Sequence, residues 1–105
     1  MAGQAELRIA ELPDSALEAA GVFHSEWIDK IADALSAADE VVIVMSDATY
    51  DHDDWRRSAA RDLARANAPK RVNVVAGSDE AAIAATLSYL AGAPGVTGQY
   101  LKTHG

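Results

Sequence analysis

The chain of 105 residues contains no cysteine. It therefore has no disulfide, no thiolate nucleophile and no cysteine ligand for zinc. Basic residues are also scarce, because 9 lysines and arginines stand against 16 aspartates and glutamates, which gives a net charge of -7. Such a charge repels the phosphate backbone of nucleic acids and the anionic surface of membranes. We expect neither nucleic acid nor a membrane among the partners of this protein.

Long apolar runs are missing as well. No stretch approaches the roughly 20 apolar residues that cross a bilayer, and the first residues lack the basic and apolar pattern of a secretory leader. These absences predict a soluble, cytoplasmic protein. The length predicts a single domain over residues 1–105. Of the apolar residues 23 are alanine and 29 are bulkier, so the core buries modest area and self-association would stabilise it.

Four short segments have the composition of β-strands. Residues 41–45 (VVIVM) and 71–76 (RVNVVA) are rich in valine, which is typical of parallel strands covered on both faces. Residues 6–12 (ELRIAEL) mix apolar and charged residues, which favours a half-exposed edge strand that ends at Pro13. Residues 96–102 (VTGQYLK) predict a last short strand.

Apolar residues recur at helical spacing in each of the three intervals between these strands. We expect Asp14 or Ser15 to cap the first helical region, which Gly21 divides into two helices. The second helix runs from Asp51 to the proline at position 69, and the third starts at a Ser78 cap. Their apolar positions are Phe23, Trp27, Ile28, Ile31 and Leu35, then Trp55, Ala59 and Leu63, then Ile83, Leu87 and Leu90.

Strands and helices thus alternate from the first strand to the last, which predicts an α/β fold with a parallel sheet of about four strands. If the strands lie in chain order, right-handed crossovers place every helix on the same face. The other face of the sheet would then expose alternate apolar side chains. We therefore expect a second copy to cover it in a homo-oligomer, most simply a dimer, with a heteromeric complex as the alternative.

Three segments, in order, resemble the C-terminal half of the short-chain dehydrogenase/reductase (SDR) family. They are residues 41–48 (VVIVMSDA), 61–77 (RDLARANAPKRVNVVAG) and 96–105 (VTGQYLKTHG). The resemblance implies a half-Rossmann-like fold that lacks the cofactor-binding half. It also implies assembly through the elements at residues 51–67 and 79–102, with a full-length relative of the family as a further candidate partner.

Two motifs on which the chemistry of the family depends have no counterpart here. No glycine-rich G-x-x-x-G-x-G turn follows the first strand, so we expect no nicotinamide cofactor. Ser46 matches the catalytic serine of the family, and Tyr50 is the nearest match to its tyrosine. Asp54 then stands where the family has a lysine, and a carboxylate there disfavours the phenolate that the chemistry needs. The sequence predicts no catalytic site, and Ser46 and Tyr50 remain its weak candidates.

The residues Asp51, His52, Asp53 and Asp54 form the stretch of the sequence that is richest in potential metal-ligating side chains. Carboxylates and imidazole together suit zinc, manganese or iron. Consecutive residues point in different directions around a helix, however, so they rarely face one ion. The favoured interpretation is helix capping, with Asp53 paired to Arg57, and no metal site; Asp51, His52 and Asp54 are the candidates if there is one.

Two main functional hypotheses follow. The first is a non-catalytic SDR-like remnant that acts as an assembly or regulatory protein. The alternative is a minimal oxidoreductase-related or metal-dependent enzyme that uses Ser46, Tyr50 and the cluster at residues 51–54. A third interpretation, a ligand-binding module without chemistry, requires a pocket near Ser46 and Gly77.

Overall fold

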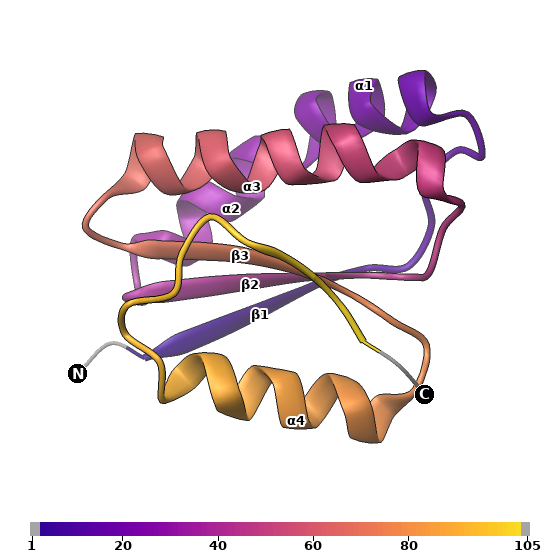
Figure 1. Cartoon of the computed structure of the whole chain (residues 1–105). Helices are drawn as coiled ribbons and strands as arrows, with labels where there is room; N and C mark the ends of the chain where they lie inside the picture. The colour runs from indigo at the N-terminus through magenta and orange to yellow at the C-terminus, as the bar shows by residue number, and fades with distance from the viewer. Residues whose placement is uncertain (1–2, 104–105) are drawn as a thin grey trace.

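A computed structural model describes residues 3–103 as one parallel four-stranded sheet with helices between the strands (Figure 1). The strands lie in chain order and are β1 (Gln4–Ile9), β2 (Glu40–Met45), β3 (Arg71–Ala76) and β4 (Tyr100–Lys102). The helices are α1 (Ala16–Glu26), α2 (Ile28–Leu35), α3 (Asp53–Asn67) and α4 (Glu80–Ala91), and a 3-10 turn η1 (Tyr50–His52) precedes α3. The predicted α/β class, the four parallel strands and the position of β1 at an edge are confirmed.

The strand β2 forms the centre of the core, because all six of its residues are buried. Its side chains alternate between the two faces of the sheet, as the period of two requires. Val41, Ile43 and Met45 join the cluster that contains Phe23 of α1, Ile31 of α2 and Leu63 of α3. Val42 and Val44 belong to a second cluster, on the opposite face. Two separate apolar layers therefore share one sheet.

The helix α4 covers this second face, so the prediction that all helices lie on one face is wrong (Figure 1). Ile83, Leu87 and Leu90 of α4 pack against Val42, Val44 and Val75 of the sheet. Because β4 still continues the sheet in the same direction, the crossover through α4 has the opposite hand to the two crossovers before it. The face that was expected to need a partner is packed within one chain.

The ends of several elements differ from the predicted ones. Ser15 caps α1, as predicted, by accepting a hydrogen bond from the amide of Glu18. The break between α1 and α2 falls at Trp27 and not at Gly21, which lies inside α1. The cap of α4 is Asp79, whereas Ser78 donates its hydroxyl to Asp47. The last strand begins at Tyr100, so residues 96–99 are irregular; the final two residues of the segment 96–105 lie outside the described residues.

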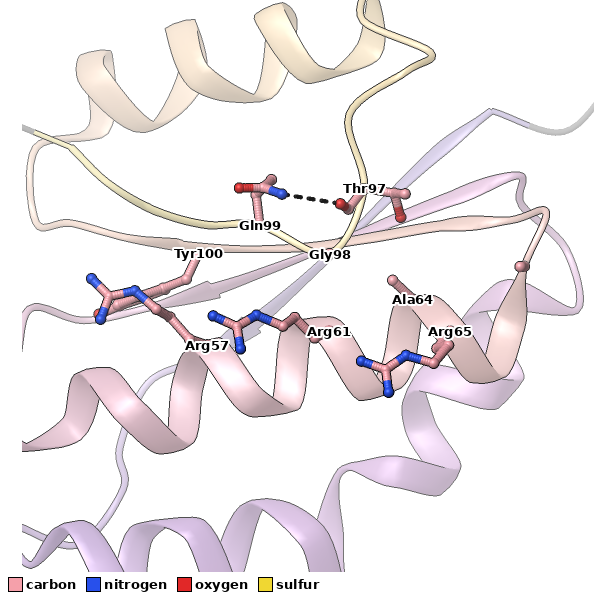
Figure 2. Close-up of a pocket in the computed structure, with 9 residues that line it drawn as sticks. Arg57, Arg61, Ala64, Arg65, Thr97, Gly98, Gln99 and Tyr100 are labelled. Atoms are coloured by element: carbon pink, nitrogen blue, oxygen red, sulfur yellow. Dashed lines mark hydrogen bonds between the residues drawn. The ribbon is translucent and has the colours of Figure 1, made fainter.

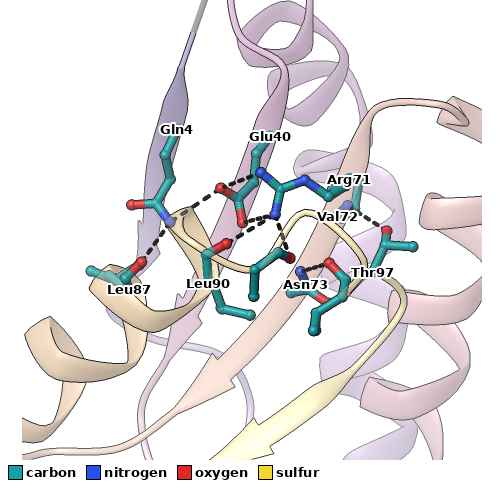
Figure 3. Close-up of polar contacts among 10 residues, drawn as sticks. Gln4, Glu40, Arg71, Val72, Asn73, Leu87, Leu90 and Thr97 are labelled. Atoms are coloured by element: carbon teal, nitrogen blue, oxygen red, sulfur yellow. Dashed lines mark hydrogen bonds and ion pairs between the residues drawn. The ribbon is translucent and has the colours of Figure 1, made fainter.

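A buried ion pair joins α4 to the sheet at the amino ends of the strands (Figure 3). Glu40 is 1% exposed, and both its oxygens lie 3.3 Å from guanidinium nitrogens of Arg71. The same Arg71 donates to the carbonyls of Leu90 and Ala93, at 2.9 and 3.1 Å. These carbonyls belong to the last turn of α4 and the residues after it, where carbonyl groups have no partner within the helix. Arg71 therefore holds the C-terminal end of α4 against the sheet.

Two amide side chains extend this network on either side (Figure 3). Gln4 of β1 donates to Glu40 and to the carbonyl of Leu87, at 3.3 and 2.8 Å. Asn73 of β3 donates to the carbonyl of Val96 and accepts from the amide of Gln99. The chain that leaves α4 is thus tied to β3 before β4 begins.

Arg71→Met should destabilise the protein strongly, because it leaves the carboxylate of Glu40 buried without its partner. Breaking a buried ion pair from one side costs about 3–5 kcal/mol of unfolding free energy. Urea unfolding followed by circular dichroism measures this loss. Arg8→Met is the matched control, since Arg8 lies on the same sheet face in exposed ion pairs with Glu6 and Glu80. Equal midpoints for the two variants would contradict the role given to Arg71.

Candidate functional site

The carboxyl ends of β1 and β2 border a cavity of about 320 Å³. In open parallel sheets, ligands bind in the crevice outside the carboxyl ends of the strands. The loop after β1 and the loop after β2 form its walls, and His52 and Arg56 complete it. The lining residues are Leu12, Pro13, Asp14, Ser46, Asp47, Ala48, Thr49, His52 and Arg56. The cavity therefore contains some of the residues that the sequence predicted for a site.

Ser46 lies between this cavity and a second one on the α4 side of the sheet. The second cavity measures about 230 Å³, and its lining includes Ser46, Gly77 and Ile83. A pocket near Ser46 and Gly77 is what the ligand-binding interpretation requires. Pockets that bury an ordinary small-molecule ligand measure about 300–1,000 Å³. The volume of the cavity at Ser46 and Gly77 is below this range, so this cavity does not support the ligand-binding interpretation.

Tyr50 is not brought together with Ser46. It lies in η1 with 85% of its surface exposed, and it lines neither of the cavities that Ser46 lines. Asp54, in the first turn of α3, is also exposed. A serine and tyrosine that act on one substrate must both lie within hydrogen-bond reach of it. This geometry does not supply such a pair.

His52 is buried, at 4% exposure, and both of its ring nitrogens have partners. The indole N–H of Trp55 donates to Nδ1 at 3.1 Å, so this nitrogen carries no proton. The other nitrogen, Nε2, then carries the proton and donates to the carbonyl of Asp14 at 2.8 Å. His52 is thus a neutral ring that ties η1 to the loop after β1, and neither nitrogen is free to ligate a metal.

The three aspartates of the cluster have separate environments. Asp51 accepts a hydrogen bond from the hydroxyl of Thr49, and this bond, together with the backbone amide of Asp51 itself, lowers the pKa of its carboxyl group. Asp53 accepts from the ammonium of Lys102 at 2.6 Å, so the predicted pair of Asp53 with Arg57 is wrong. Within residues 3–103, no group of three or more potential metal-ligating side chains occurs.

The predicted capping role of the cluster holds only in part. Asp53 and Asp54 lie in the first turn of α3, where carboxylates interact favourably with the helix dipole. The N-cap itself is His52, whose side chain makes no capping hydrogen bond. Two of the partners lie far away in the sequence, namely Lys102 of β4 for Asp53 and Asp14 in the loop after β1 for His52. Thr49 and Trp55, the partners of Asp51 and His52, are sequence neighbours.

Arg56 is a site residue that the sequence analysis missed. Its side chain is buried, with 2% of the residue exposed, between the rings of Trp55 and Tyr100. It donates to the carbonyl of Ser46 at 3.0 Å and to the hydroxyl of Tyr100 at 3.2 Å. Its burial could have been predicted from helical spacing, because position 56 lies on the same face of α3 as Ala59, Ala60 and Leu63. Arg56 fixes the end of β2 to β4.

The chain after β4 covers the carboxyl end of β3. Thr103 donates from its amide and its hydroxyl to the carbonyl of Ala76, at 2.8 and 3.1 Å. A Cβ atom at Gly77 would lie 2.0 Å from the Thr103 hydroxyl oxygen. Glycine at position 77 is therefore required by the close approach of this segment.

No helix within residues 3–103 is long and apolar enough to cross a membrane.

Comparison with known proteins gives one match. The family model described as SDR-like, short chain dehydrogenase-like protein, matches residues 7–103. No curated protein and no solved structure matches the chain. The match begins within β1 and ends at Thr103, so it includes α1 and α2 as well as the first two segments that carried the resemblance and residues 96–103 of the third. The chain belongs to the short chain dehydrogenase-like family.

Proposed function

We propose that this chain is a non-catalytic member of the short chain dehydrogenase-like family and acts as a self-associating assembly or regulatory protein. The main observation in favour of a non-catalytic protein is the position of Tyr50, which is exposed and lies outside both cavities at Ser46. Asp54 supports the same conclusion, because the resemblance to the SDR family implies a lysine at this position and a carboxylate cannot supply its positive charge. In the reaction that the resemblance implies, the tyrosine donates the proton, and Ser46 alone does not replace it.

Self-association is supported by the surface of α4. Glu80, its first residue, is the only charged residue in the sequence of this helix. The side away from the sheet is exposed and consists of small or uncharged residues, namely Ala81, Ala84, Ala85, Ser88 and Tyr89. Tyr89 is 60% exposed, and the neighbouring alanines allow the backbone of a second helix to approach closely. The helix thus has an apolar outer face in addition to the one that it buries.

The occupant that we assign to this face is a second copy of the chain. The resemblance to the SDR family implies assembly through residues 79–102, which contain α4 and β4. Helix α3, the other element that the resemblance implies, exposes Arg57, Arg61 and Arg65. Like charges that face each other across a contact weaken it, so the uncharged α4 is the better interface.

Ala84→Glu should weaken self-association, because it places a carboxylate of each copy at the contact between two α4 helices. Glutamate has nearly the helix propensity of alanine, so the fold should persist. Sedimentation velocity should show a dissociation constant raised at least about tenfold, which is about 1.4 kcal/mol. The control is Ala32→Glu on the exposed side of α2, which should leave association unchanged. A wild-type protein that stays monomeric at every concentration would refute the assembly role.

NADH and NADPH should not bind to the protein, because it lacks the glycine-rich turn that holds the pyrophosphate of these cofactors. Isothermal titration calorimetry with each nucleotide measures this directly. Carbonyl reduction can be followed in parallel by NADPH absorbance, with Ser46→Ala and Tyr50→Phe as variants. Micromolar binding of either nucleotide, or a turnover that both variants abolish, would favour the enzyme alternative.

A further inference from the structure

A groove lined by three arginines lies between α3 and residues 97–100 (Figure 2). It shares no lining residue with the cavities at Ser46. Its volume is about 610 Å³, which is within the range of pockets that bury a small ligand. Figure 2 shows Arg57, Arg61 and Arg65 in a row along α3, beside the segment that contains Thr97, Gly98 and Gln99. We call this feature the arginine groove; Ala64, Ala68 and Tyr100 complete its lining.

The three guanidinium groups have few acidic partners in the protein. Within residues 3–103, Arg57 and Arg61 form no ion pair, and Arg65 lies 4.0 Å from Asp62 in an exposed pair. Asp53 is one turn before Arg57 and could have paired with it, but one oxygen of its carboxylate binds Lys102 and the other is buried. Like charges four residues apart destabilise a helix. The three guanidinium groups therefore repel one another when no anion is bound.

The lining of the arginine groove contains no aspartate or glutamate, although the chain has 16 of them. Its floor is made of small residues. Gly98 has a positive φ of 74° and its position for a Cβ is 3.4 Å from the Cβ of Ala64, so the segment lies close against α3. A larger side chain at Gly98, Ala64 or Ala68 would occupy the space beside the guanidinium groups. The groove is thus open and lined by cations and neutral groups.

The spacing of the arginines limits the ligand that can bind all of them. Residues four apart on a helix are about 6 Å apart along its axis. A guanidinium group binds phosphate or carboxylate through two parallel hydrogen bonds. Exposed contacts of this kind are individually weak, so a single small anion would bind poorly. An anion with several charged groups at this spacing contacts two or three arginines at once.

We propose that the arginine groove binds a multivalent anion whose phosphate or carboxylate groups are about 6 Å apart. Two sources have this chemistry. One is a free polyphosphate or polycarboxylate, and the other is an extended peptide segment with acidic residues at alternate positions, which lie about 6.6 Å apart. The groove is on the α3 side of the sheet, opposite α4, so this binding is independent of self-association through α4.

Calorimetry with inorganic tripolyphosphate and with a short capped peptide of alternating aspartate and threonine tests this proposal. Both titrations are done at about 0.1 M salt, where charges separated by more than about 10 Å are largely screened. At least one probe should bind more tightly than orthophosphate does. Arg57→Gln combined with Arg61→Gln should then raise the dissociation constant at least about tenfold, because it removes two charge-assisted contacts.

The control variant combines Arg8→Gln with Lys30→Gln. It removes the same number of positive charges at exposed positions outside the groove, so it separates local contacts from net charge. Its dissociation constant should stay within about twofold of the wild-type value, as expected for distant screened charges. Circular dichroism checks that all variants fold.

Each outcome decides the proposal. Binding of tripolyphosphate that depends on Arg57 and Arg61 identifies a phosphate ligand, and binding of the peptide with the same dependence identifies an acidic segment. If neither probe binds, or if both double variants lose the same affinity, the proposal is wrong. The proposed assembly role is unaffected by this result, since sedimentation of the Ala84→Glu variant measures it separately.

Discussion

The ion pair between Glu40 and Arg71 holds α4 to the sheet, and the covering of the second face depends on this contact. A carboxylate that is almost fully buried requires a partner, and Arg71 provides it while also holding two carbonyls at the end of α4. These contacts secure α4 on the face that a right-handed crossover would have left empty. Without them, this face would expose Val42 and Val44 to water. A few polar groups at the amino ends of the strands thus determine which surface of the sheet is covered and leave the carboxyl ends free for cavities.

Much of the fold could be predicted from the sequence, because it follows from local patterns. The valine-rich strands, the alternation of strands and helices and the Ser15 cap all depend on neighbouring residues. The face that α4 covers could not be predicted this way. It depends on Gln4 and Arg71, which lie 67 residues apart in the chain and bond the same helix. The general rule on crossover hand gave the wrong side, and the polar bonds that hold α4 on the observed side come from residues far apart in the sequence.

The site was predicted less well, for a related reason. His52, a candidate metal ligand, does line the cavity at the strand ends, but its two hydrogen bonds to Asp14 and Trp55 make it structural. Asp53 pairs with Lys102 across the fold and not with Arg57 along its own helix. Arg56 lay on the apolar stripe of α3, where a charged residue is unusual and its burial could have been suspected. The spacing of neighbouring residues does not indicate which side chain of a distant strand will pair with them. The partner of Asp53 could therefore not be predicted from the sequence.

The anchoring of α4 also has a consequence for the order in which the protein can be built. Its bonds to the sheet use Gln4 of β1 and the Glu40–Arg71 pair of β2 and β3, so the full set of anchoring bonds exists only when these three strands are aligned. The strand β4 has three residues and follows α4, so it adds to a finished edge. During synthesis, a nascent chain that stops before α4 lacks the helix that covers Val42, Val44 and Val75, and exposed apolar surface of this kind favours aggregation.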